Sequence, residues 1–394
     1  MTEGSSVRGE AFVFLSDSHF TVRDEPWATG VTSSDGPAHA HEFRLFLEHL
    51  SARRPEDRPQ SVVLLGDWLD FSDIAERAAV RGIWSGVDGG TRASETLQWI
   101  TEANRAVFEG LKHCLGAGIS VEVVVGNHDM DLARQGVQEQ LRAQVNPRVL
   151  GAASLNFHAW LFHVPGLVYA EHGHQHQVIN HIPMMLHPYE SGGAQRMYRT
   201  LSTVLGEYRH RRRDAEDLDW VRVVLENAGC LYQLCTGTFD QVNSRRREEI
   251  ARYQQQCLPQ YARAMGLDPQ AVQDIDTMSR FRVGALIAAA SRQVGNRLFG
   301  TSADYLAEAG RRIDRLLRAA DCSVPFYIFG HSHQASRRPL ATSADASHYI
   351  NTGTWSPYTR GPHPRAEGTR MELTYVVVRR SAASGSSADL CRWS

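Results

Sequence analysis

The sequence predicts an α/β protein that carries a large helical insertion, and three observations lead to this prediction. Strand-like apolar runs alternate with amphipathic helical patterns over residues 11–180. Helical patterns then replace the strand-like runs over residues 182–320. Strand-like runs return at residues 326–329, 348–352 and 372–378. We therefore expect a two-part α/β core that is interrupted by a mainly helical block.

Within the first part of the core, helices and loops separate the strand-like runs. Residues 41–52 place apolar side chains at helical spacing, and residues 94–115 repeat this pattern. Gly116 and Gly118 are expected to end the second of these helices before the next strand. Residues 85–92 are rich in glycine and aspartate and are predicted to form a loop at the rim of the site.

The helical block is expected to contain four amphipathic helices, at residues 214–228, 245–265, 270–298 and 304–320. The predicted division of the chain is a first core part at 1–181, an insertion or cap at 182–320, a second core part at 321–380 and a tail at 381–394. The tail is rich in Ser, Ala and Gly, a composition that predicts flexibility.

Composition limits the classes of function. Lys and Arg together number 42 and Asp and Glu 44, so the total charge argues neither for nor against a nucleic-acid partner. Residues 1–10 lack the apolar centre of a signal peptide, and no apolar run approaches the roughly 20 residues that span a bilayer. These features predict a cytoplasmic protein without a transmembrane segment.

Five strand-like runs each end in residues that can bind a metal ion. The runs cover residues 12–15, 62–65, 121–125, 167–169 and 326–329. The residues that follow them are, in chain order, Asp17 with His19, Asp67, Asn127 with His128, His172, and His331 with His333. Ligands of open α/β sheets bind at the carboxyl ends of the strands. The pattern therefore predicts that these side chains meet at one sheet edge and form a two-metal hydrolytic centre.

The clusters carry a resemblance to a known family. Asp17-Ser18-His19, Gly66-Asp67-Trp68-Leu69-Asp70, Gly126-Asn127-His128-Asp129, His172-Gly173-His174 and Gly330-His331-Ser332-His333 occur in that order. This series resembles the signature blocks of the calcineurin-like metallophosphoesterase superfamily. The resemblance covers the core but not the insertion. It implies a two-sheet sandwich with α/β/β/α layers.

The resemblance also implies a role for each residue of the series. Asp17, His19 and His333 would hold one metal ion, Asn127, His172 and His331 a second, and Asp67 would bridge the two. Asn127 and His128 would contact the substrate. His128 would act as the acid that protonates the leaving oxygen, and Asp70 would orient it.

Three assignments remain open at this stage. His172 is preferred in the fourth block because it is the first histidine after the strand, although His174 and His176 alternate with it. Asp129 is expected to cap the following helix, with a ligand role as the alternative. The basic residues 209–213 are expected to form a solvated helix face, with a patch that binds phosphate or lipid head groups as the alternative.

The donor set favours particular cofactors and a particular chemistry. Carboxylate and imidazole together suit Mn²⁺ first, with Fe or Zn as alternatives, and disfavour Ca²⁺ and Mg²⁺. A carboxylate such as Asp67 can hold two cations about 3.5–4 Å apart. Such a pair would direct a bridging hydroxide at phosphorus, without a covalent enzyme intermediate.

The sequence therefore predicts a metal-dependent phosphoesterase that acts on a phosphomonoester, a phosphodiester or a pyrophosphate. A small or lipid-like phosphoester is the preferred substrate, because a helical cap would enclose such a molecule better than it would admit a duplex. One alternative is a nuclease of the same superfamily. The other is a binding scaffold without catalysis, which the complete ligand set disfavours. The sequence does not indicate the oligomeric state.

Overall fold

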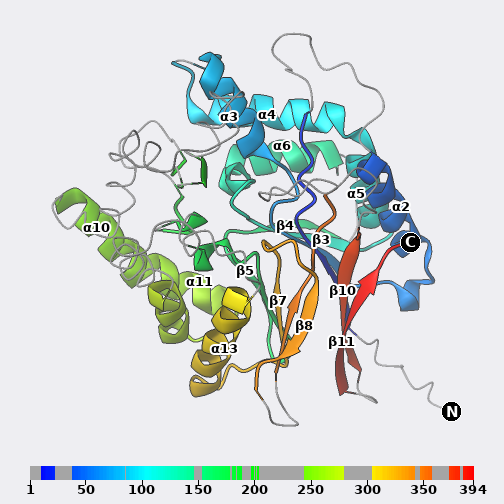
Figure 1. Ribbon diagram of the computed structural model, residues 1–394, viewed down its shortest axis with the longest axis vertical. Helices are drawn as coiled ribbons and strands as arrows, with labels where there is room; N and C mark the ends of the chain where they lie inside the picture. The colour runs from blue at the N-terminus through cyan, green and yellow to red at the C-terminus, as the bar shows by residue number, and fades with distance from the viewer. Residues whose placement is uncertain are drawn as a thin grey trace.

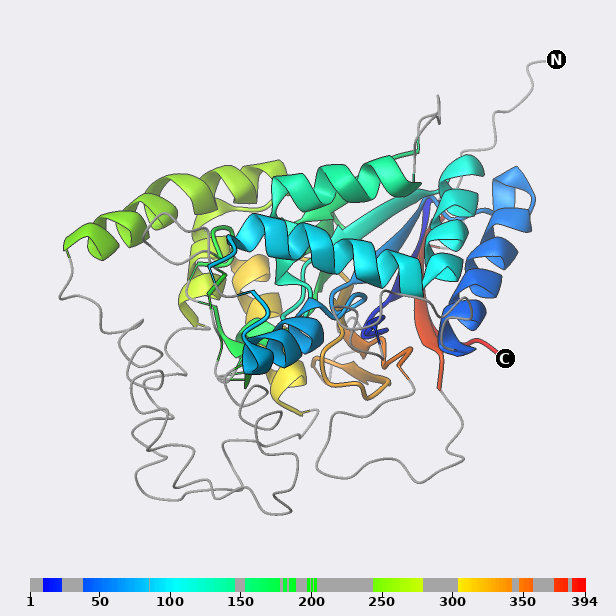
Figure 2. The ribbon, with the colours of Figure 1, turned by 90° about the horizontal axis from the view of Figure 1, so that it is seen from above.

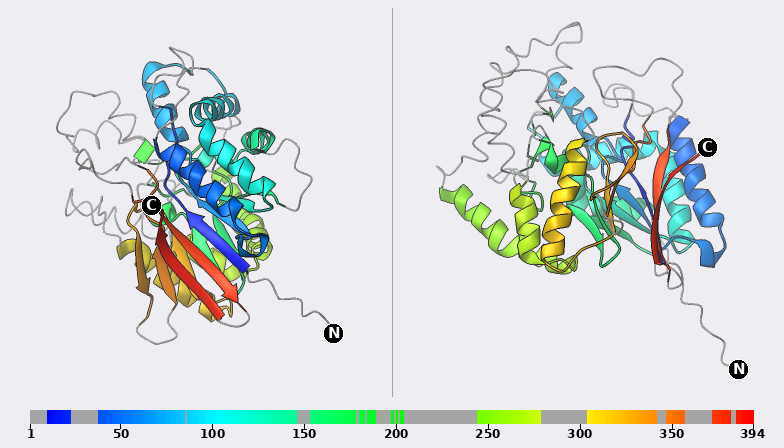
Figure 3. Two further views of the ribbon diagram at one scale, coloured as in Figure 1. Left: turned by 90° about the vertical axis from the view of Figure 1, so that its right-hand side faces the viewer. Right: turned by 60° about the horizontal axis from the view of Figure 1, so that its bottom comes forward.

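The computed structural model of the chain confirms the predicted α/β/β/α sandwich (Figure 1). It describes residues 10–22, 38–84, 86–145, 153–177, 180–182, 184–188, 197–198, 200, 202–203, 244–278, 304–341, 347–356, 372–381 and 385–394. Two sheets pack face to face, and helices cover the outer face of each (Figure 3). None of the helices in these residues has the length and apolar character that crossing a membrane requires.

The first sheet has the strand order β11-β10-β1-β2-β3-β4. Its strands are β1 (Glu10–Leu15), β2 (Ser61–Leu65), β3 (Ser120–Val124), β4 (Leu155–His158), β10 (Thr374–Ser381) and β11 (Gly385–Arg392). β1 to β4 run parallel, and β10 joins β1 in the antiparallel direction. The carboxyl ends of β1, β2 and β3 therefore lie side by side at one edge, as the sequence predicts.

The second sheet has the strand order β5-β6-β7-β9-β8. Its strands are β5 (Leu161–Val164), β6 (Val168–Glu171), β7 (Phe326–Phe329), β8 (Ser336–Pro339) and β9 (His348–Asn351). β6, β7 and β9 run parallel. The fourth and fifth predicted clusters follow β6 and β7, so both leave neighbouring strands of one sheet.

Side chains alternate between two apolar cores along each central strand. Phe12 and Phe14 of β1 point to the core between the sheets, whereas Val13 and Leu15 belong to the core beneath the helices. The helices over the first sheet are α2 (Ala38–Ala52), α3 (Phe71–Arg81), α4 (Gly89–Ala103), α5 (Arg105–Gly116) and α6 (Gln135–Val145), several of which Figure 2 shows above the strands. The first sheet therefore has an apolar core on each face, one beneath the helices and one between the two sheets.

The described helices of the predicted insertion cover the second sheet. They are α10 (Ser244–Arg252), a π-helical turn (Tyr253–Cys257), α11 (Leu258–Ala264) and α13 (Asp304–Ala319), and residues 269–278 are also helical. The Tyr261 hydroxyl lies 2.9 Å from the backbone nitrogen of Leu161 and 3.0 Å from its oxygen. In α13, a Cβ atom at Gly310 would lie 3.6 Å from Phe329 and Tyr349. These helices form the fourth layer of the sandwich.

Two local predictions in the first core part are wrong. The helix predicted at residues 94–115 is broken at Asn104, whose amide donates to the backbone oxygens of Thr21 and Ile100. The loop predicted at residues 85–92 gives way to α4 at Gly89, because the Asp88 carboxylate accepts hydrogen bonds from the first turn. The predicted helix at 214–228, the second part of 270–298 and the basic residues 209–213 lie outside the described residues.

The interpretation of residues 381–394 as a flexible tail is also wrong. Residues Gly385–Arg392 form β11, which pairs with β10 along its whole length. Ala388 belongs to the core between the sheets, while Ser386 and Ser387 are exposed. β11 is an edge strand with a solvated face, so its composition looks like that of a linker.

We expect an Ala388→Asp variant to lose at least about 2 kcal/mol of unfolding free energy, because it places a carboxylate in the core between the sheets. Ser387→Asp adds the same group at the neighbouring exposed position and should change stability by less than about 0.5 kcal/mol. Urea unfolding of both variants makes the comparison. Equal stability of the two variants would contradict the pairing of β11.

Candidate metal centre

The loops that follow the strands of the site hold their residues in left-handed backbone conformations. Within the described residues, only six residues other than glycine have a positive φ. Five of them are predicted metal ligands: Asp17 at 54°, His19 at 48°, Asp67 at 53°, His331 at 65° and His333 at 58°. This conformation costs of order 1 kcal/mol for each such residue. Its concentration at the predicted ligands is therefore a mark of a functional site.

Glycines allow these loops to approach one another. A Cβ atom at Gly126 would lie 2.2 Å from Oδ1 of Asp67 and 2.6 Å from the Asp67 backbone nitrogen. At Gly330 it would lie 2.7 Å from Oδ2 of Asp17. All three distances are shorter than any van der Waals contact, so a side chain at either glycine would push two clusters apart.

Backbone amides fix both carboxylates, so that one oxygen of each is left for the centre. The backbone nitrogen of His331 donates to Oδ2 of Asp17 at 2.9 Å, and Oδ1 of Asp17 lies 3.1 Å from Nε2 of His333. The backbone nitrogen of His128 donates in the same way to Oδ1 of Asp67 at 2.8 Å. Each carboxylate therefore connects two clusters and presents its second oxygen to a histidine.

The predicted ligands gather into two neighbouring groups. One contains Asp17, His19 and His333, the other contains Asp67, His172 and His331, and the ligand atoms within each group lie within 4.8 Å of one another. Oδ2 of Asp67 lies 3.1 Å from Nε2 of His172 and 4.0 Å from Nε2 of His19. Asp67 thus stands between the two groups, as a bridging residue must.

The fit of these groups to metal ions can be tested on atoms that lack hydrogen bonds. Oδ1 of Asp17, Oδ1 of Asn127 and Nε2 of His172 are buried and make no hydrogen bond. The first and the last make the ion-pair contacts of 3.1 Å given above. Buried polar atoms without hydrogen bonds destabilise the fold, and all three atoms are of the types that transition-metal ions bind as ligands. The residues therefore fit a pair of divalent cations.

The charge states of the buried groups show which of them are ready to bind a cation. Burial raises the pKa of Asp17, but His333 and His172 outweigh it and lower the pKa to about 2. The pKa of Asp67 lies well below its ordinary value because its histidine neighbours, His172 first, overcome the same effect of burial. Burial and the charge of His172 lower the pKa of His331 to about 3. Two ionised carboxylates thus face a neutral His331. Burial lowers the pKa of His172, but Asp67 and Asp17 outweigh it and raise the pKa to about 10, so His172 must lose its proton when a cation binds.

Hydrogen bonds distinguish the three histidines of the fourth block. Nδ1 of His172 lies 2.9 Å from the Leu65 backbone oxygen, which leaves Nε2 directed at Asp67. His176 instead pairs with Glu171, at 2.5 Å, away from both carboxylates of the centre. His174 is buried beside His172 and His331, and burial lowers its pKa well below the ordinary value. The preference for His172 among the three histidines is therefore supported by its contacts.

A third group holds the predicted acid. Nδ1 of His128 lies 3.1 Å from Oδ1 of Asp70 and 2.5 Å from the Ser72 hydroxyl. The other oxygen of Asp70 lies 3.3 Å from Nδ1 of His19. Asp70 thus fixes the orientation of His19 and His128 together. Sequence reasoning missed Ser72, although its position two residues after Asp70 is compatible with an N-terminal helical turn.

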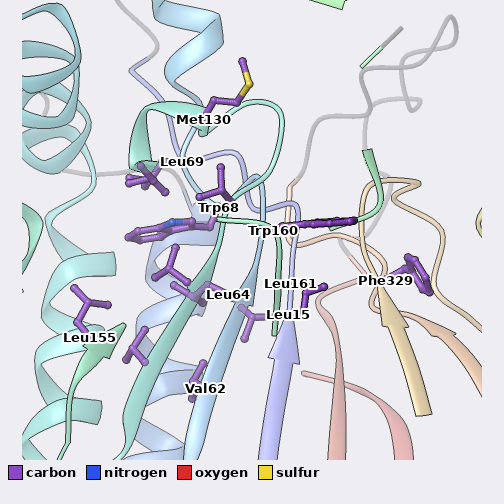
Figure 4. Packing of buried hydrophobic residues seen from close by; sticks show 14 of the residues in the cluster. Leu15, Val62, Leu64, Trp68, Leu69, Met130, Leu155, Trp160, Leu161 and Phe329 are labelled. Atoms are coloured by element: carbon purple, nitrogen blue, oxygen red, sulfur yellow. The ribbon is translucent and has the colours of Figure 1, made fainter. Parts of the chain in front are cut away.

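Three other residues have structural roles. Asp129 does not cap the following 3₁₀ turn, as predicted, but accepts hydrogen bonds from the backbone nitrogens of Trp68 and Gly126 at 3.0 and 2.6 Å. It therefore ties the second cluster to the third. Trp68 itself is buried and lies at the ends of the strands, near Leu69 and above Leu64 (Figure 4). The backbone nitrogen of Trp355 donates to the backbone oxygen of Asp17 at 3.2 Å, and the Trp355 side chain is fully buried.

The four-layer fold and this edge of carboxylates and imidazoles define the class of metallophosphoesterases. The sequence matches the family model described as calcineurin-like phosphoesterase over residues 11–235, so the chain belongs to that family.

No curated protein matches the sequence. One solved structure that resembles the chain is a putative 5′-nucleotidase from Staphylococcus aureus in complex with α-ketoglutarate. It is 12% identical, with a TM-score of 0.31, and the match covers 98% of this chain and 53% of that one. The chain thus spans about half the length of that protein.

We expect Gly126→Ala to weaken divalent-metal binding at least about tenfold, because the new Cβ would displace Asp67. It should also lower the unfolding free energy by about 1–3 kcal/mol. Gly136→Ala is the matched control: it lies in α6 with no atom within 4 Å of the new Cβ, and should leave metal binding unchanged. Calorimetric titration with Mn²⁺ compares the two, and equal affinities would contradict the close packing of Gly126 on Asp67.

Proposed function

We propose that this protein is a phosphoesterase that uses two divalent metal ions. Asp17, His19 and His333 would hold one ion, and Asn127, His172 and His331 the other, with Asp67 shared. The observation that carries the proposal is the position of Asp67, whose Oδ2 lies within 4.0 Å of histidines from both groups. The set of nitrogen and oxygen donors favours Mn²⁺, with Fe or Zn as alternatives.

The residues of the chain would divide the work of phosphoester hydrolysis. Two bound cations would act as Lewis acids toward the phosphoryl group and would generate a nucleophile from water at neutral pH. Asp17 and Asp67 would offset part of the cationic charge and leave a net positive centre for an anionic substrate. The side chain of His128 is 16% exposed and is held by Asp70 and Ser72. It can therefore give a proton to the leaving oxygen.

The proposed substrates are small or lipid-like phosphomonoesters, phosphodiesters or pyrophosphates. The balanced charge of the chain supplies no general attraction to nucleic acids, so this class is preferred to the nuclease alternative. The capping role is predicted for residues 182–320, of which residues 204–243 and 279–303 lie outside the described part of the chain. The scaffold alternative is disfavoured because six of the seven predicted ligands lie in two groups whose ligand atoms are within 4.8 Å of one another.

A hydrolysis screen tests the proposed activity. The purified protein, supplied with Mn²⁺, should hydrolyse p-nitrophenyl phosphate or its bis ester, and panels of nucleotide sugars, lipid phosphates and single-stranded DNA separate the substrate classes. Asp67→Asn keeps the shape of the side chain but removes its charge, and should abolish both activity and binding of the metal pair. Full turnover by Asp67→Asn would contradict the shared role of this residue.

We expect His128→Ala to retain metal binding and to reduce kcat at least about 100-fold, because it removes the proton donor and no metal ligand. His113→Ala is the control, since the side chain of His113 is 56% exposed on α5 and should leave kcat unchanged. Steady-state kinetics and metal analysis give the comparison. Unchanged turnover in His128→Ala would remove its role as the acid.

A further inference from the structure

A second set of polar side chains, outside the five clusters, makes hydrogen bonds to two of the proposed ligands. Gln177 follows the 3₁₀ turn after β6, and Asn180 and Ser202 come later in the chain. We propose that Asn180 is a positioning residue that, together with Gln177, orients Asn127 and His331 for metal binding. This inference rests on the proposed function and extends it.

The Asn127 amide is oriented by Asn180. Nδ2 of Asn127 donates to Oδ1 of Asn180 across 3.4 Å, and both side chains are 5% exposed. An amide has its donor and its acceptor at opposite sides. Because its nitrogen faces Asn180, Oδ1 of Asn127 faces the other way, and this buried atom has no hydrogen-bond partner. Asn180 thus holds the Asn127 amide so that its oxygen, the atom that can bind a cation, faces the centre.

His331 is fixed by the same network. Its Nε2 lies 2.6 Å from Oε1 of Gln177 and 3.4 Å from Nδ2 of Asn180. The shorter contact is the hydrogen bond, and since an amide oxygen can only accept, Nε2 must carry the hydrogen. Nδ1 of His331 then holds the lone pair that a metal ligand needs. Gln177 therefore selects the tautomer of His331.

Asn180 holds Gln177 in turn. Nδ2 of Asn180 donates to Oε1 of Gln177 at 2.5 Å, and Oδ1 of Asn180 accepts from the Ser202 hydroxyl. These bonds agree with one another. Oδ1 of Asn180 accepts from Asn127 and Ser202, and Oε1 of Gln177 accepts from Asn180 and His331. One side chain, that of Asn180, thereby acts on two ligands of the same ion.

Ser202 extends the network into the segment beyond the fourth cluster. Its hydroxyl contacts Asn180 and lies 2.8 Å from the Thr200 hydroxyl. Both residues fall within the predicted insertion, which the resemblance to known family blocks does not cover. The geometry of the metal centre is therefore set in part by residues outside those blocks.

Mn²⁺ titration of the full chain by calorimetry tests the proposal. The wild-type protein should bind two ions, and Asn180→Ala should weaken one of them about 10–100-fold while leaving the other unchanged. Asn180→Asp keeps the acceptor for Asn127 but loses the donor to Gln177, so its affinity should lie between the two. Asn156→Ala is the matched control, because Asn156 bonds Glu122 on β3, away from the site.

A purely structural role makes a different prediction. It would lower the thermal stability of the metal-free protein and leave both affinities of the folded protein unchanged. If Asn180→Ala does not fold, Gln177→Ala carries the test, because its half-buried side chain is less costly to truncate and should weaken the same ion. Two ions at wild-type affinity in these variants would overturn the positioning role alone. A wild-type protein that binds no Mn²⁺ would overturn the proposed function as well.

Discussion

The position of the Asp67 carboxylate, which accepts from a backbone amide with one oxygen and faces the centre with the other, is the constraint on which the other features of the site depend. One oxygen accepts from the His128 backbone at 2.8 Å, and the other faces His172 at 3.1 Å. The Asp67 backbone oxygen accepts from the nitrogen of His19 at 2.9 Å. This one residue therefore joins four clusters, from strands of both sheets. Close approach of the loops, and so glycine at position 126, follows from it.

The sequence predicted the fold class and the approach of the five clusters to one another better than it predicted the bounds of single helices and strands. The clusters after β1, β2, β3, β6 and β7 follow clear apolar runs, and parallel strands bring their carboxyl ends together. His331 and His333 lie beyond the residues matched by the family model, yet the His331 nitrogen donates to Asp17 at 2.9 Å. The order of the five short motifs in the chain was therefore enough to predict that His331 and His333 lie near Asp17.

The elements that were missed have weak local signals for physical reasons. β11 and β8 are edge strands with polar solvated faces, so their sequences Gly385–Arg392 and Ser336–Pro339 lack an apolar run. The break at Asn104 depends on a contact with Thr21, a residue distant in sequence. The contacts of Asn180 depend in the same way on tertiary packing. Periodicity describes only neighbours in the chain, and so it cannot reveal such contacts.

The site also carries a cost that the rest of the protein must offset. Five left-handed residues each cost of order 1 kcal/mol, and two ionised carboxylates lie buried beside atoms that have no hydrogen-bond partner. Buried Trp68 and Trp355 lie in or against the loops of the site, and Asp129 ties two of them together. Anything that binds the folded state alone stabilises it by mass action. Cations bound at this edge would therefore offset part of this cost, and this couples occupancy of the centre to the stability of both sheets.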